Sequence, residues 1–162
     1  MPVMRIAIAL ILIAGTIAAQ QQQQPAAPVP AILENYKPVK KMLPDWDWVY
    51  IFIAECYDGL GQMDSAKEEL KQAIELNPDH AWGWYLKGAL IARDHRLEEA
   101  EPLLTRAIEL EATMPSFWYN RGLVRAALGR KKGALADYEE AIRLGHPQPD
   151  MIRQRIDDLK RP

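Results

Sequence analysis

The sequence is poor in the residues that build catalytic and metal centres. Its 162 residues include one cysteine, three histidines and two serines. A single cysteine excludes both an intramolecular disulfide framework and a cysteine-ligated zinc site. The 20 Lys and Arg residues are balanced by 22 Asp and Glu residues, so no net basic field favours binding to nucleic acid. The 49% of hydrophobic and 26% of charged residues are typical of a folded protein.

The few candidate catalytic groups match no known catalytic or metal-binding pattern. His80, His95 and His146 form no His-x-x-x-His pair. Ser65 and Ser116 lie at expected helix starts, where serine commonly acts as a cap, and neither belongs to a Gly-x-Ser-x-Gly sequence. No glycine-rich phosphate loop is present. We therefore expect no enzymatic activity, no cofactor, no metal and no small-molecule substrate.

The beginning of the chain differs from the rest. Arg5 is the only charged residue among residues 1–19, and the 14-residue apolar stretch Ile6–Ala19 ends in small side chains. This order is typical of a secretory signal peptide, with cleavage after Ala18 or Ala19. The stretch is shorter than the roughly 17–25 residues of a membrane span, so an uncleaved membrane anchor is the less favoured alternative. The pattern predicts export, to a bacterial periplasm or to the outside of the cell.

Two further segments precede the main body of the chain. Residues 20–30 are a glutamine run followed by alternating Pro and Ala, which predicts a flexible spacer. Residues 31–46 are expected to be an ordered, partly helical lead-in, in the manner of a degenerate half-repeat. Pro38 argues against one continuous helix in this lead-in, because proline removes a helix hydrogen bond.

From residue 47 the sequence repeats with a period of 34 residues, in the blocks 47–80, 81–114 and 115–148. Columns of identical residues stay in register across these blocks, which indicates an internal repeat. The columns are Trp84 and Trp118; Gly88 and Gly122; Ala66, Ala100 and Ala134; and Ala73, Ala107 and Ala141.

The pattern of the blocks resembles the tetratricopeptide repeat, with an aromatic residue at position 4, a small residue at 8, Ala at 20 and 27, and Pro near 32. The resemblance implies an all-α solenoid of three helix–turn–helix repeats. Positions 4, 8 and 11 share one helix face, so Trp84 and Trp118 are predicted to lie in the core and Gly88 and Gly122 at close helix contacts. Residues 149–162 resemble the capping helix that closes such arrays, with 149–160 predicted as helix.

In this family the first helices of the repeats line a concave face, through positions 2, 5, 9 and 12. The chain has mostly apolar side chains at these positions, and an exposed apolar surface commonly marks an interaction site. Some family members bind a C-terminal carboxylate through Lys, Arg or Asn residues on this face, and the chain has none of these residues at these positions. The pattern therefore favours an apolar or proline-containing segment as the bound partner. The chain is thus predicted to be an exported scaffold that binds another protein or peptide segment. The predicted binding residues are Trp48, Ile51, Trp82, Tyr85, Tyr119 and Leu123.

Self-association is the alternative function. In that case the protein is a structural or envelope assembly factor, and its concave face is covered by its own N-terminal segment or by a second copy in a homo-oligomer. Membrane contact is expected only through an uncleaved signal segment. The net charge is −6 in the first block, −2 in the second and +3 in the third. This gradient could orient a partner of opposite polarity or favour head-to-tail association of copies of the chain. Cys56 either links two chains or packs as a small hydrophobic residue.

Overall fold

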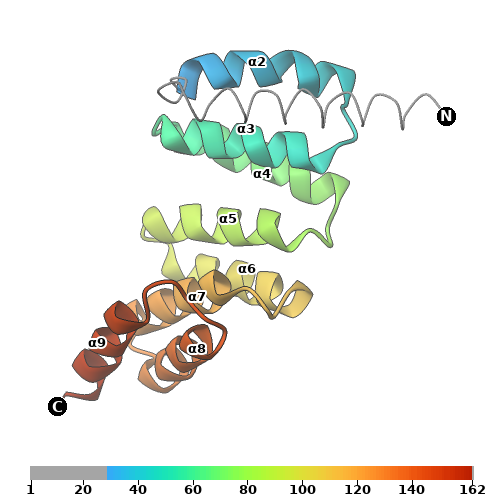
Figure 1. Cartoon of the computed structure of the whole chain (residues 1–162). Helices are drawn as coiled ribbons and strands as arrows, with labels where there is room; N and C mark the ends of the chain where they lie inside the picture. Colours follow the sequence, from blue (N-terminus) through green and yellow to red (C-terminus); the bar gives the residue numbers. More distant parts are fainter. Residues whose placement is uncertain (1–28, 162) are drawn as a thin grey trace.

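The computed structural model describes residues 29–161, and the predicted signal peptide and most of the predicted spacer lie outside this range. The described residues form eight helices and no strand. The helices stack in chain order into a solenoid (Figure 1), which confirms the predicted all-α repeat fold. They are α2 (Val29–Met42), α3 (Asp47–Gly59), α4 (Met63–Leu76), α5 (Ala81–Arg93), α6 (Leu97–Leu110), α7 (Pro115–Ala127), α8 (Lys131–Arg143) and α9 (Pro149–Lys160).

Each 34-residue block contains one pair of helices, α3 with α4, α5 with α6, and α7 with α8. The turn inside each pair needs one residue with a left-handed backbone, which glycine adopts without steric cost. Gly61 and Gly129 have φ angles of 73° and 71°. His95 stands one period from both and adopts a φ of 59°, the only positive φ of a non-glycine residue in the described part of the chain. The turn geometry is therefore kept even where the glycine is missing.

The core lies between the paired helices and is built on the repeated alanines. All six alanines of the two columns are buried, together with Leu70, Leu104 and Tyr138 at position 24. A Cβ atom on Gly88 would lie 2.9 Å from Cγ of Leu104, and one on Gly122 would lie 2.7 Å from Cδ1 of Tyr138. The paired helices therefore meet at these glycines, as the sequence predicts.

The position-4 aromatic residues tie each first helix to the turn before it. The side chains of Tyr50, Trp84 and Trp118 each donate a 2.8 Å hydrogen bond to a backbone carbonyl six residues earlier. Tyr50 is buried, whereas Trp84 and Trp118 are half-buried. Both tryptophans pack against buried core clusters, as predicted, but they stay half-buried because their indole N–H groups reach a turn carbonyl.

Helices α2 and α9 cover the two ends of the repeats. The ring of Tyr36 in α2 lies 4.3 Å from that of Phe52 in α3, and Leu33 is buried. In α9, Ile152 and Ile156 are buried against the last pair of helices. These end helices cover apolar surfaces that the terminal repeats would otherwise expose.

Helix α2 runs without interruption through Pro38, contrary to the expectation of a break. Pro102 likewise lies inside α6. Both prolines are exposed, as are Glu34 and Glu98, whose carbonyl groups lose their usual helix partner. Because these carbonyl groups lie on the outer side of the helix, water can replace the missing hydrogen bond.

The serines do not cap the helices, contrary to the prediction. Helix α4 begins at Met63 with Gln62 as its N-cap residue, and α7 begins at Pro115 with Met114 as its N-cap residue. Ser65 and Ser116 therefore lie inside the first turns. Neither helix has a side-chain hydrogen bond at its N-cap, and α7 begins with Pro115, a residue that is favoured at the first helix position.

Candidate functional site

All six predicted binding residues occupy positions 2, 5 or 9 of α3, α5 and α7, and the exposed and half-buried side chains at these positions are here called the first-helix surface. The structure exposes them very unequally. Trp48 is 60% exposed, and Ile51 is 1% exposed. The other four are half-buried: Trp82, Tyr85, Tyr119 and Leu123. Trp48 is therefore the most accessible apolar side chain of the predicted set.

Ile51 is a core residue and does not line the surface, so its assignment as a binding residue is corrected. Its side chain lies against Gly83 in the next first helix, where a glycine Cβ would be 3.8 Å from Cδ1 of Ile51. The same pair of positions meets one repeat later. There Tyr85 corresponds to Ile51 and Phe117 to Gly83, and the two rings stack with 4.7 Å between their centroids. The side chain at position 5 thus packs against the first helix of the next repeat.

Tyr85 and Tyr119 hold their repeats to the next element of the array. The Asn120 side chain donates a 3.1 Å hydrogen bond to the Tyr85 hydroxyl, and burial raises the pKa of that hydroxyl. The Tyr119 ring lies 4.9 Å from that of His146, and its hydroxyl is 3.9 Å from Sδ of Met151 in α9. Because both tyrosines make structural contacts, we expect their removal to cost stability.

Trp48 and Trp82 occupy position 2 of α3 and α5 and lie at the accessible part of the surface. The Trp48 ring meets the His80 ring edge-on at 4.2 Å. The indole N–H of Trp82 donates a 3.3 Å hydrogen bond to Oε1 of Glu55, so this side chain reaches from α5 to α3. Glu55 is itself exposed. Its carboxylate adjoins the Trp82 indole, although the sequence pattern did not single it out as a binding group.

A network of charged side chains lies between α6, α7 and α8. Arg121 forms two hydrogen bonds with Asp137, of 2.7 Å and 3.0 Å, and Arg125 joins Asp137 to Glu101 at 3.0 Å and 2.8 Å. Arg121 is 8% exposed and Asp137 1% exposed. Sequence reasoning missed this network. The sequence feature that could have indicated it is a charged residue directly before each of two core residues, Gly122 and Tyr138.

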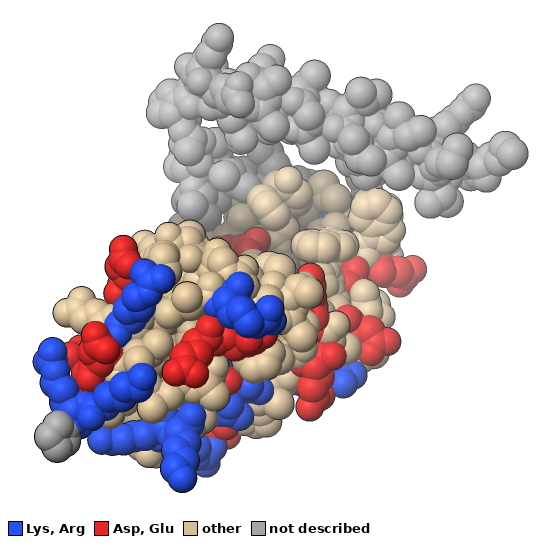
Figure 2. All heavy atoms as spheres, turned by 60° about the horizontal axis from the view of Figure 1, so that its bottom comes forward, with Lys and Arg blue, Asp and Glu red and all other residues tan. Residues whose placement is uncertain are grey.

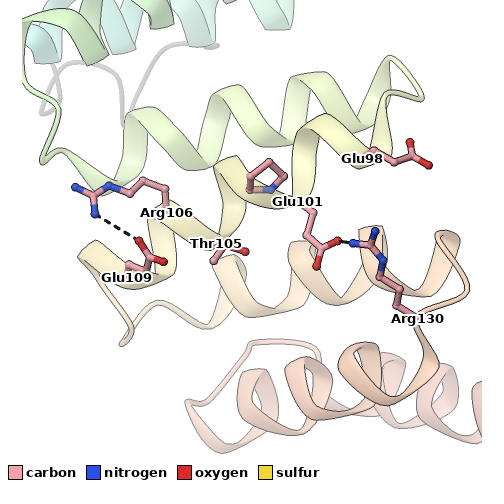
Figure 3. A pocket seen from close by; sticks show the side chains of 7 residues that line it. Glu98, Glu101, Thr105, Arg106, Glu109 and Arg130 are labelled. Atoms are coloured by element: carbon pink, nitrogen blue, oxygen red, sulfur yellow. Dashed lines mark hydrogen bonds and ion pairs between the residues drawn. The ribbon is translucent and has the colours of Figure 1, made fainter.

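Two depressions in the surface lie away from the predicted aromatic positions. One, of about 380 Å³, is lined by charged residues of α6 and by Arg130, and its ion pairs join Arg106 to Glu109 and Arg130 to Glu101 (Figure 3). The other, of about 490 Å³, lies between α2, α3 and α4, where Lys40 contacts both Glu69 and the Tyr50 ring. Most of their charged side chains are held in ion pairs, whereas Glu98 and Lys41 have no ion pair among the described residues.

The remaining groups that could take part in chemistry include the histidine, cysteine and acidic side chains. Within residues 29–161, no group of three or more His, Cys, Asp or Glu side chains could hold a metal ion. Cys56 is buried, and burial raises the pKa of its thiol, which favours the role of a small packed residue. None of the helices described is both long and apolar enough to cross a membrane. Lys and Arg side chains are numerous at the C-terminal end of the array (Figure 2).

Sequence comparison identifies the repeats directly. Three sequence models of the tetratricopeptide repeat match residues 49–80, 69–101 and 93–149. Together they span the helices from α3 to the beginning of α9. No curated protein sequence matches the chain significantly.

Solved structures share the fold. The crystal structure of MamA is 25% identical, with a TM-score of 0.73 over 81% of this chain and 76% of that one. YrrB, described as a TPR protein with an unusual peptide-binding site, is 19% identical, with a TM-score of 0.73 over 78% of this chain and 65% of its own. The first TPR of Spaghetti (RPAP3), bound to the HSP90 peptide SRMEEVD, is 19% identical, with a TM-score of 0.66 over 70% and 89% of the two chains. The repeat period, the paired helices and these matches together show that the chain belongs to the tetratricopeptide repeat family.

Proposed function

We propose that the protein is an interaction scaffold that binds a segment of another protein on its first-helix surface, centred on Trp48 and Trp82. The observation that carries this proposal is the exposure of Trp48, a large aromatic side chain that is 60% accessible on α3, where the next three residues, Val49 to Ile51, are buried. Aromatic side chains bury a large area with few rotatable bonds, so they dominate binding energy where a partner encloses them. The peptide-binding TPR proteins among the structural neighbours support the same class of function.

The proposal narrows the predicted set of binding residues. The side chains at position 5 pack against the next element of the array, so Ile51 is not a binding residue, and Tyr85 and Tyr119 serve mainly as structural contacts beneath the surface. Leu123 is half-buried and packs against the last core cluster. The binding energy therefore rests on Trp48 and Trp82, in the half of the array nearer the N-terminus.

Photo-crosslinking in the native host tests the proposal and supplies the partner segment. A photoreactive amino acid at position 48 should form an adduct with a different protein, whereas the same residue at Leu76, an exposed apolar position on α4, should form none. If adducts formed only between copies of this chain, the result would contradict the proposal and support self-association. No adduct at position 48 would contradict both functions.

Trp48→Ala is then expected to weaken binding of the crosslinked segment about 30-fold, the effect of losing a hot spot worth about 2 kcal/mol. Its unfolding midpoint should stay close to that of the wild type, because most of the Trp48 side chain contacts no other part of the protein. Isothermal titration calorimetry and urea unfolding measure the two quantities. Leu76→Ala, the matched exposed control, should change neither the affinity nor the midpoint. Equal affinities of Trp48→Ala and the wild type would remove Trp48 from the site.

We further propose that the protein is exported, on the basis of Arg5, the apolar stretch Ile6–Ala19 and the small residues that end it. Mass spectrometry of the protein purified from its native host is expected to find a mature N-terminus at Ala19 or Gln20. A chain that keeps its first residues in the membrane fraction would show an anchor instead.

A further inference from the structure

The charge around Trp48 and Trp82 restricts the partner that this surface can accept. Helix α3 carries Asp47, Glu55 and Asp58 and has no Lys or Arg residue. Asp47 is contacted by His80 and Asn77, and Asp58 is paired with Arg93. Among the described residues, Glu55 has no cationic partner, and it accepts a 3.3 Å hydrogen bond from the indole N–H of Trp82. An exposed carboxylate without a cation therefore adjoins the Trp82 indole, on the same helix as Trp48.

From this arrangement we infer that the first-helix surface accepts an extended segment with a Lys or Arg side chain, whose cationic group binds at Glu55 beside Trp82 while the segment runs along α3 toward Trp48; this inference rests on the proposed function. Glu55 lies seven residues after Trp48, two turns further along the same helix face, and Trp82 reaches it from the next repeat. A cation there donates a charge-assisted hydrogen bond to the carboxylate.

The charge of the first repeat points to the same occupant. Residues 47–80 contain 2 basic and 8 acidic residues, a net charge of −6, so the local potential attracts a basic segment and repels an acidic one. An acidic segment such as the SRMEEVD peptide bound to the first TPR of RPAP3 would bring like charges to Glu55. The neutral side chains at position 5, Ile51, Tyr85 and Tyr119, offer that peptide no compensating cation.

Selection from a random peptide library tests the inference even before a natural partner is identified. Twelve-residue peptides displayed on phage are selected on the purified protein, and clones that also bind Trp48→Ala equally well are discarded. We expect the remaining peptides to be enriched in Lys or Arg. Enrichment in Asp or Glu, or no charge preference, would overturn the inference while leaving the proposed function in place. Failure to recover any Trp48-dependent peptide would count against the proposed function, and the inference would fall with it.

Glu55→Gln then tests the role of the carboxylate. The substitution keeps the shape and the hydrogen-bond acceptor of the side chain but removes its charge, so it should weaken a selected basic peptide at least about 5-fold and reduce the salt dependence of binding. Glu75→Gln, an exposed position on α4, removes the same charge from the same repeat and is the matched control. Equal losses in both variants would show a general charge effect and overturn the assignment of Glu55.

Discussion

Replacing Asp137 with alanine is expected to lower the free energy of unfolding by about 3–5 kcal/mol, because it leaves the Arg121 guanidinium buried without its carboxylate. Asp137 accepts hydrogen bonds from Arg121 at 2.7 Å and 3.0 Å and from Arg125 at 3.0 Å, and it is 1% exposed. Urea unfolding followed by circular dichroism measures the change.

Glu140→Ala is the matched control for this prediction. It removes a carboxylate from the same helix, where Glu140 pairs with Arg143 at 2.5 Å. Arg143 is exposed to water, which screens the pair, so the midpoint should change little. If the two variants unfold at the same urea concentration, the Asp137 network does not hold α7 against α8. If Asp137→Leu combined with Arg121→Leu restores most of the stability, the cost lies in the unpaired charge, as expected for buried pairs.

The second large effect is expected at the glycines where paired helices meet. Gly122→Ala should destabilise the protein by about 1–3 kcal/mol, although alanine is the better helix former by about 1 kcal/mol. The added Cβ would lie 2.7 Å from both Cδ1 and Cε1 of Tyr138, a buried ring with no room to move aside. Gly88→Leu should have an effect of the same kind, because a Cβ there would already lie 2.9 Å from Cγ of Leu104.

Gly83→Ala gives the opposite expectation with the same change of residue. Gly83 also lies inside a helix, but its added Cβ would meet Ile74 at 3.4 Å, an ordinary van der Waals contact. Stability should therefore stay the same or rise. Differential scanning calorimetry should find a lower unfolding temperature for Gly122→Ala and an unchanged or higher one for Gly83→Ala. A shift of the same sign and size in both would mean that the helix contact at Gly122 is looser than the structure shows.

Packing between successive repeats explains why the predicted binding residues divided into two groups. Helical spacing places positions 2 and 5 on one face of a first helix, and that much follows from one sequence. The side chain at position 5 turns toward position 3 of the next repeat, as Tyr85 does toward Phe117, and packs there. At position 2 of the first repeat, the Trp48 ring meets the His80 ring edge-on and remains 60% exposed.

The period of 34 residues, the paired helices, the alanine columns and the glycines at which helices meet could all be predicted from the amino-acid sequence. These features are repeated, and each one follows from the residue's own position along a helix. Three other features became visible only in the folded chain: Ile51 is buried, α2 continues through Pro38, and Arg121 and Asp137 form a buried pair. Each of these depends on which side chain of another element lies opposite. A single sequence carries no record of that pairing, because the facing residue is set by how the repeats twist against one another when they stack.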